Sequence, residues 1–196
     1  MRRFPLAPIL VLAVGLGSVA AGAESSGVWL DVPFVKQKRN GCGAASISMV
    51  MQYWIRNGAR IPQDGADASL IERALYSRDA KGIFGSGMQD YFERAGFRTF
   101  VLRAKWSDLE QHLLKGRPLI VCLRENSSGP LHYVVVAGLD WQHGFVLVND
   151  PARRKLLKLD RTSFEEGWSA TQDWTLLALP RQDTLLRHDT LPRHDN

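Results

Sequence analysis

The sequence lacks several features that would point to a common class of partner. It has no basic run with interleaved aromatic residues, so nothing in it predicts binding to nucleic acid. Its formal net charge is +5, and without Arg2 and Arg3 the 23 remaining basic residues face 20 acidic ones, which leaves +3. That excess is weak evidence for an anionic surface as partner. The chain also lacks an internal linker, and residues 24–196 are enough for one domain with a sizeable core.

The N-terminal 23 residues have the composition of a secretory signal peptide. A basic end at residues 1–3 is followed by an apolar run from Phe4 to about Val19 and by the small residues Ala21-Gly22-Ala23. The run is short and interrupted by Pro5 and Pro8, which argues against a membrane span, although an uncleaved anchor is the alternative. We therefore expect export to the periplasm or the extracellular space, with no stable membrane insertion after cleavage.

Cysteine is scarce as well, with Cys42 and Cys122 alone in the sequence. In an exported protein two cysteines are candidates for a disulfide. Cys122, however, lies in the continuous apolar run 118–123, which is typical of a buried strand. We therefore expect Cys122 in the core and Cys42 as a free thiol.

Apolar periodicity predicts helices in the first half of the chain and strands in the second. Helices are expected at 43–56, 68–76 and 88–95, and a fourth is expected from a Ser107 cap to Lys115. The third follows a glycine-rich stretch at 81–87, which is interpreted as a plain connector, with the border of a substrate groove as the alternative. Strands are expected at 97–103, 117–123, 131–139, 144–149, 155–160 and 174–179. This order is typical of an α+β domain in which N-terminal helices pack on an antiparallel sheet.

The composition changes after Pro180, and residues 181–196 nearly repeat themselves without a periodic apolar face. Such a segment is predicted to be a disordered tail. His188 and His194 lie in it, but isolated histidines on a flexible segment seldom form a defined metal site. The domain boundaries are therefore expected at 24 and 180, and no metal is expected.

Cys42 lies where a loop is expected to lead into a helix. The apolar positions that follow it recur at helical spacing: Ala45, Met49, Val50, Tyr53 and Trp54. The first backbone N–H groups of a helix stabilise negative charge, so a thiolate is favoured there. Gly41 and Gly43 leave room for a substrate carbonyl, and the Gln37 amide is a candidate oxyanion donor. The competing interpretation of Cys42 is a small buried hydrophobe.

A cysteine nucleophile needs a base, and a third group that orients the base. Among the five histidines, His112 is expected inside a helix, His143 in a turn and two in the tail. His132 opens the apolar strand 131–138, where an imidazole is costly to bury without a partner. His132 is therefore the candidate base, and a structural histidine is the alternative.

Asp150 ends the next expected strand, just before Pro151. If the two strands pair as a hairpin about 140–144, residues whose numbers sum to about 284 face each other, which places Asp150 diagonal to His132 on one face. Asn149 is the competing orienting residue, but alternation along the strand puts it on the opposite face. The two polar groups are thus expected to meet at one end of the sheet.

These residues resemble the bacteriocin-processing, or double-glycine, branch of the papain-like cysteine peptidases. The shared motifs are Gln37 with residues 42–45, then 131–135, then 149–151, and together they span roughly residues 29–179. The resemblance implies a papain-like fold with Cys42 as nucleophile, His132 as base and then acid, Asp150 as orienting residue and Gln37 as oxyanion donor. The glutamine is often six residues before the cysteine in that family, and here it is five.

We therefore expect an exported cysteine peptidase that cleaves a peptide or protein substrate through an acyl-enzyme intermediate and needs no metal or cofactor. Two alternatives stay open. One is a catalytically silent peptide-binding module on the same fold, and the presence of cysteine, histidine and aspartate together argues against it. The other is a thiol acyltransferase, which uses the same three groups but passes the acyl group to an amine.

Overall fold

The computed structural model describes residues 26–124 and 129–182. In chain order the elements are β1 (Gly27–Trp29), α1 (Cys42–Arg56), the 3-10 helix η1 (Gln63–Ala66), α2 (Ala68–Leu75), α3 (Gly85–Arg94), β2 (Phe97–Arg103), α4 (Trp106–Leu114), β3 (Leu119–Leu123), β4 (His132–Asp140), β5 (Phe145–Asn149), β6 (Leu157–Asp160), α5 (Arg161–Ser169) and β7 (Trp174–Pro180). The predicted signal peptide, 1–23, and residues 183–196 of the predicted tail lie outside the described residues, so both stay predictions.

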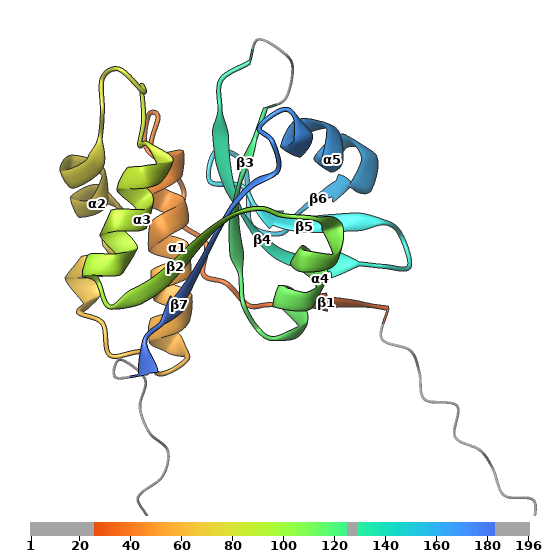
Figure 1. Ribbon diagram of the computed structural model, residues 1–196, viewed down its shortest axis with the longest axis horizontal. Coiled ribbons are helices and arrows are strands. Elements are labelled where there is room, and N and C mark those ends of the chain that lie inside the picture. Colours follow the sequence, from red (N-terminus) through yellow and green to blue (C-terminus); the bar gives the residue numbers. More distant parts are fainter. Residues whose placement is uncertain (1–25, 125–128, 183–196) are drawn as a thin grey trace, which may run out of the picture.

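A seven-stranded sheet forms the centre of the molecule. Its strand order is β2-β7-β3-β4-β5-β6, with β1 paired to β4, and every pairing is antiparallel. Figure 1 shows α1, α2 and α3 gathered on one side of the sheet and α4 and α5 on the other. The predicted α+β class, with N-terminal helices packed on an antiparallel sheet, is confirmed.

Each face of the sheet has its own hydrophobic core, because successive side chains of a strand point to opposite faces. On one face, Val135 and Ala137 of β4 pack with residues of α1 and α3 such as Met49 and Phe92. On the other face, Val134 and Val136 pack with residues of α4 and α5, which include Leu109, Leu113, Phe164 and Trp168. The sheet is therefore covered on both faces and is held in place from both sides.

Helix α1 crosses the first face and is buried from Gly43 to Met51, while its last turn is partly exposed. Ser46 Oγ donates a hydrogen bond to the carbonyl of Tyr133 in β4 at 3.3 Å, and Trp54 Nε1 donates to the carbonyl of Ala178 in β7 at 3.0 Å. Hydrogen bonds near both ends of the helix thus fix its orientation across the sheet, in addition to its apolar packing. The start of α1, at Cys42, is fixed beside the start of β4.

Three helices differ from the sequence-based expectation. Helix α4 begins at Trp106, and its first turn is closed by Asp108, whose Oδ2 accepts from the N–H of Lys105 at 2.7 Å, so the prediction of Ser107 as cap is wrong. Helix α3 begins at Gly85, inside the stretch expected to be a connector. Helix α5 was not predicted, and its start is capped by Asp160, which accepts from the N–H of Ser163 at 2.9 Å.

No helix within the described ranges is both long enough and apolar enough to cross a membrane.

Candidate active site

A cleft of about 760 Å³ opens where the start of α1 meets the start of β4 and the end of β5. The residues that line it come from four separate segments of the chain: Gln37, Asn40, Cys42, Ala80, Lys81, Gly129, Pro130, Leu131, His132, Asp150, Ala152 and Arg153. The four residues predicted to act together are all among them. The cleft is therefore the candidate active site.

Cys42 is the first residue of α1 and is partly exposed to the cleft. The preceding residue, Gly41, has no side chain that could cap the helix. The first backbone N–H groups of α1, beside the sulfur, therefore have no side-chain acceptor at the cap position. Gly43 packs against Ile83, since a Cβ there would lie 3.1 Å from the Ile83 Cβ. The missing side chain of Gly43 therefore lets the segment before α3 lie against the start of α1, beside the cleft.

The surroundings of Cys42 favour its ionised form. Burial alone would raise the pKa of the thiol. A hydrogen bond with His132, backbone hydrogen bonds at Tyr133 and Gly43, and the charge of His132 outweigh burial, so the pKa of Cys42 lies below that of an ordinary thiol. A lowered thiol pKa raises the fraction of nucleophilic thiolate near neutral pH.

His132 connects Cys42 to Asp150. Its Nε2–H donates to Asp150 Oδ1 at 2.8 Å, which leaves Nδ1 as the ring nitrogen available to Cys42. Burial would lower the pKa of His132, but the hydrogen bonds with Asp150 and Cys42 and their charges raise it to about 9. The imidazole is therefore protonated at neutral pH, opposite a thiol that tends to ionise.

The Asp150 carboxylate is held by its own turn as well as by His132. Its Oδ1 also accepts from the backbone N–H of Ala152 at 2.9 Å. Burial would raise the pKa of Asp150, but the hydrogen bond and charge of His132, with the backbone N–H groups of Ala152 and Arg153, keep it below its usual value. Asp150 thus stays ionised and fixes the orientation of the imidazole ring.

Asn149 lies on the opposite face of β5, as alternation predicts. It pairs with Val135 and is fully buried. Its Nδ2 donates to the carbonyl of Val32 at 3.1 Å, and its Oδ1 accepts from the N–H of Leu156 at 3.0 Å. Asn149 therefore holds the segment that leads toward Gln37 and does not contact the imidazole.

Gln37 lines the cleft from the loop before α1. Its backbone N–H donates to the carbonyl of Pro151 at 2.9 Å, which ties this loop to the turn that carries Asp150. Its Oε1 is buried and has no hydrogen-bond partner among the described residues. A buried polar atom without a partner costs about 1–3 kcal/mol, so the side chain is not placed there for stability.

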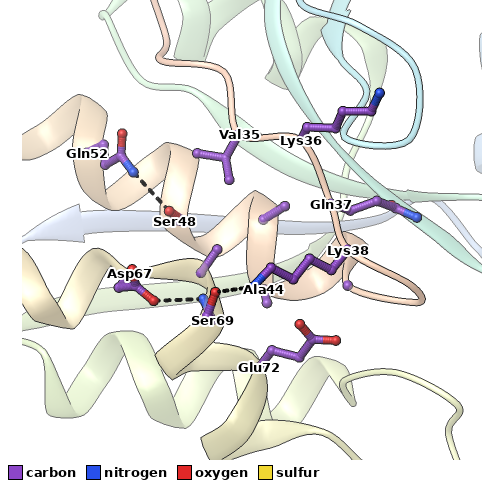
Figure 2. Close-up of a pocket in the computed structure, with 13 residues that line it drawn as sticks. Val35, Lys36, Gln37, Lys38, Ala44, Ser48, Gln52, Asp67, Ser69 and Glu72 are labelled. Atoms are coloured by element: carbon purple, nitrogen blue, oxygen red, sulfur yellow. Dashed lines mark hydrogen bonds between the residues drawn. The ribbon is translucent and has the colours of Figure 1, made fainter.

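The same loop is anchored on its other side across a smaller pocket of about 250 Å³ between α1 and α2. Figure 2 shows the Lys38 side chain crossing this pocket toward α2, while the Gln37 side chain points away from it. Lys38 Nζ donates to Ser69 Oγ at 3.0 Å. The loop is thus held from both sides, by Lys38 across the pocket and by the backbone of Gln37 at the cleft.

The other cysteine and the other histidines of the described residues lie outside the cleft. Cys122 is buried in β3 as a free thiol, and burial, with the nearby Cys42, raises its pKa to about 11. His143 bonds Asp140 in the turn between β4 and β5, and His112 lies in α4. No three histidine, cysteine, aspartate or glutamate side chains gather as a metal site in the part of the chain that the structure describes.

Sequence reasoning did not find three contributors to the cleft. The N–H of Ala152 supports Asp150, and Lys81 and Arg153 bring two cationic side chains to its lining. The Asp-Pro-Ala sequence is a signal for a side chain that bonds the backbone two residues on. Nothing in the local sequence places Lys81 beside Cys42, because that proximity depends on the packing of Ile83 against Gly43.

A helix that presents a cysteine to a histidine–aspartate pair at the end of an antiparallel sheet is the arrangement of papain-like peptidases. Residues 29–175 match the Peptidase_C39 like family, and the chain belongs to this family. The family suspected from the sequence is thereby confirmed. No curated protein matches the chain.

Several solved structures share the fold. A C39-like peptidase from Bacillus anthracis is 17% identical with a TM-score of 0.62, and the alignment covers 79% of this chain and 98% of that one. The peptidase domain of Streptococcus ComA, a bifunctional ABC transporter of a quorum-sensing pathway, is 18% identical with a TM-score of 0.59, and the coverage is 76% and 98%. A double-glycine-motif protease from an AMS/PCAT transporter, solved with a leader peptide, is 22% identical with a TM-score of 0.56, and the coverage is 79% and 95%.

Proposed function

We propose that the chain is an exported cysteine peptidase that cleaves peptide bonds through an acyl-enzyme intermediate. The observation that carries this proposal is the His132 imidazole held between the Cys42 thiol and Asp150, with Nε2 at 2.8 Å from the carboxylate. A binding module does not need a charged imidazole beside an acidic thiol. Burial of these groups costs free energy, and ionisable groups with shifted pKa values in a cleft are typical of catalytic sites, which supports the proposal.

In the acylation step, the Cys42 thiolate attacks the carbonyl carbon of the scissile bond. Negative charge moves to the carbonyl oxygen, and the N–H of Cys42 at the start of α1 and the amide of Gln37 are the donors available to it. Protonated His132 gives its proton to the leaving amine, and the C–N bond breaks. A thioester on Cys42 and a free amine are the products of this step.

In the deacylation step, His132 is neutral and takes a proton from a water molecule that attacks the thioester carbonyl. The C–S bond breaks, the carboxylic acid product leaves, and the thiolate and imidazolium are restored. Asp150 stays ionised throughout and holds the imidazole through Nε2. No step requires a redox group or another cofactor.

Peptide as the substrate class is supported by the family and by the relative that was solved with a leader peptide. Export is supported by the composition of residues 1–23. An acyltransferase is the second candidate, because an amine in place of water at the thioester would need the same three side chains.

The test is to incubate purified mature protein with a diverse peptide library and to identify cut sites by mass spectrometry. Cys42→Ala should abolish cleavage, and Cys122→Ala, which removes the other thiol, should leave it intact. Addition of a small amine such as glycinamide separates the two reactions, because a transferase yields amide products that a hydrolase lacks. Cleavage that persists in Cys42→Ala would refute the proposal.

A further inference from the structure

We propose that the substrate is an acidic peptide segment, whose carboxylates flank the scissile bond and are recognised by Lys81 and Arg153 in the cleft. This inference rests on the proposed function and narrows it to a class of substrate. Both cations line the same cleft as Cys42, and they come from different sides of it. Lys81 belongs to the turn before α3, and Arg153 belongs to the turn after β5.

Lys81 is presented by a tight turn that is closed at its base. Ser77 and Gly82 exchange backbone hydrogen bonds of 2.8 and 3.2 Å, and the N–H of Lys81 donates to the carbonyl of Arg78 at 3.2 Å. The next residue but one, Ile83, is buried against Gly43 beside the nucleophile. The backbone of Lys81 is thus fixed relative to Cys42, and its exposed side chain has no ion-pair partner among the described residues.

Arg153 is presented by the turn that orients Asp150. Its N–H donates to the carbonyl of Asp150 at 3.0 Å, next to the Ala152 N–H that holds the carboxylate. The Asp150 carboxylate bonds His132 and the Ala152 N–H through Oδ1, and no ion pair between Asp150 and Arg153 occurs among the described residues. The Arg153 side chain is exposed, and it forms no ion pair within the described ranges.

Among the described residues, the ionisable groups that line the cleft leave an excess of positive charge at every stage of the reaction. Before attack, two negative groups, Cys42 and Asp150, face three positive ones, His132, Lys81 and Arg153. In the acyl-enzyme the sulfur and the imidazole are both neutral, and one carboxylate faces two cations. An acidic substrate removes this excess, whereas a basic one adds to it and is repelled.

Two short segments next to the cleft are rich in basic residues, which the net charge of the whole chain does not show. Residues 36–39 and 153–155 carry three basic residues each and no acidic one, although the chain without Arg2 and Arg3 has an excess of only +3. The hydrogen bond from Gln37 N–H to the Pro151 carbonyl joins the first segment to the turn that leads into the second. Of the six basic side chains, Lys155 is paired with Asp31 and Lys38 with Ser69. Of these six, Arg153 lines the cleft, and the composition alone does not reveal which basic side chain faces the substrate.

The experiment compares cleavage of three matched peptide libraries, with acidic, neutral or basic residues at the positions around the scissile bond. Lys81→Glu and Arg153→Glu should each lower kcat/KM for acidic peptides by roughly three- to tenfold and improve it for basic ones. Arg78→Glu and Arg154→Glu are the matched controls, because they make the same charge change in the same two turns, three residues from Lys81 and one from Arg153, without lining the cleft. These controls should leave the preference largely unchanged.

Binding is measured separately, so that failure of this inference can be told from failure of the peptidase proposal. Fluorescence anisotropy with Cys42→Ala should show tighter binding of acidic peptides, weakened by Lys81→Glu and Arg153→Glu. Acidic peptides that bind but are never cut by the wild type would refute the peptidase and leave the charge preference standing. Cleavage without preference for acidic peptides would overturn the inference and leave the peptidase standing. Equal competition by an oligonucleotide, with equal losses in the cleft and control variants, would also overturn it, since it would mean non-specific attraction of polyanions.

Discussion

Replacing His132 with alanine should shift the titration of the Cys42 thiol to higher pH. In the wild type, burial raises the pKa of Cys42, and the hydrogen bond and charge of His132, with two backbone hydrogen bonds, bring it below that of an ordinary thiol. His132→Ala removes the hydrogen bond and the charge but leaves the burial. Only the backbone hydrogen bonds at Tyr133 and Gly43 then oppose it, so the pKa moves upward.

The size of the effect on alkylation follows from two opposing factors. At a pH well below both pKa values, each unit of pKa lowering raises the thiolate fraction tenfold. Thiolate nucleophilicity falls with pKa with a Brønsted slope of about 0.4–0.5, so the net gain in rate is about three- to fourfold for each unit. Iodoacetamide at pH 6 should therefore modify Cys42 faster than glutathione in the wild type, and His132→Ala should lose most of that excess.

The assay is the rate of alkylation at Cys42 between pH 5 and 10, read from the Cys42 peptide by mass spectrometry. Cys122 is an internal control, because it is buried and its pKa is raised to about 11, so it should stay unmodified until the protein unfolds. The pH profile of peptidase activity should also have a descending limb at high pH. Activity should fall as the pH rises through about 9, because His132 loses its proton there. A Cys42 profile that matches glutathione, or one that His132→Ala does not move, would refute the reasoning.

Asp150→Asn should lower kcat by about tenfold or more while the melting temperature changes little, because an amide stabilises the imidazolium less well. Asn149→Ala should instead cost about 2–4 kcal/mol in free energy of unfolding, since it leaves two buried backbone groups without partners, and the activity of the folded fraction should persist; the reverse pattern would make Asn149 the orienting residue. Gly138→Ala should lower the melting temperature, because a Cβ there would lie 2.5 Å from the carbonyl of Val28 in β1. Truncation after Gln182 should leave melting and activity nearly unchanged, and a fall of more than a few degrees would contradict the predicted tail. Mass spectrometry of exported protein should find the first 23 residues removed, whereas a chain that retains Met1 would indicate an anchor.

The hairpin that carries the site was predictable because its apolar pattern and its turn specify one register. Val135 faces Asn149 and Val136 faces Val148, so the numbers sum to 284 as expected near the site. Beyond Val136 the register shifts by one residue at a bulge. The bulge lies toward the turn of the hairpin, whereas His132 lies at the open end of the hairpin. The bulge therefore does not affect the predicted contact between His132 and Asp150.

The helices that were misjudged are those in which tertiary packing outweighs local preference. Helix α3 includes glycines in its first turn, which single-sequence reasoning assigns to a loop. Helix α5 has only nine residues with Gly167 among them, and its apolar face is reduced to Phe164 and Trp168. An Asp160 cap followed by those two aromatic residues four apart was the available signal.

The cationic side chains of the cleft were out of reach of sequence reasoning for a different reason. A charged residue on an exposed turn does not belong to a periodic apolar pattern, so the sequence does not indicate where it lies. Its position relative to Cys42 is set only when distant segments pack together. Arg153 follows the predicted Asp150, but Lys81 depends on the contact between Ile83 and Gly43. The contact between His132 and Asp150 could be predicted because it joins adjacent strands. The joint position of Lys81 and Arg153 could not, because they lie on turns of separate elements.

The consecutive residues Asn149 and Asp150 tie the chemistry to the alignment of a single strand. Asn149 holds the segment that leads to Gln37, and Asp150 holds His132. A slip of β5 by one residue would exchange their faces, placing a carboxylate in the core and an amide beside the imidazole. A misaligned chain would therefore lose the oxyanion side and the base side of the site together. Correct pairing of one short strand is therefore a shared requirement for both sides of the candidate site.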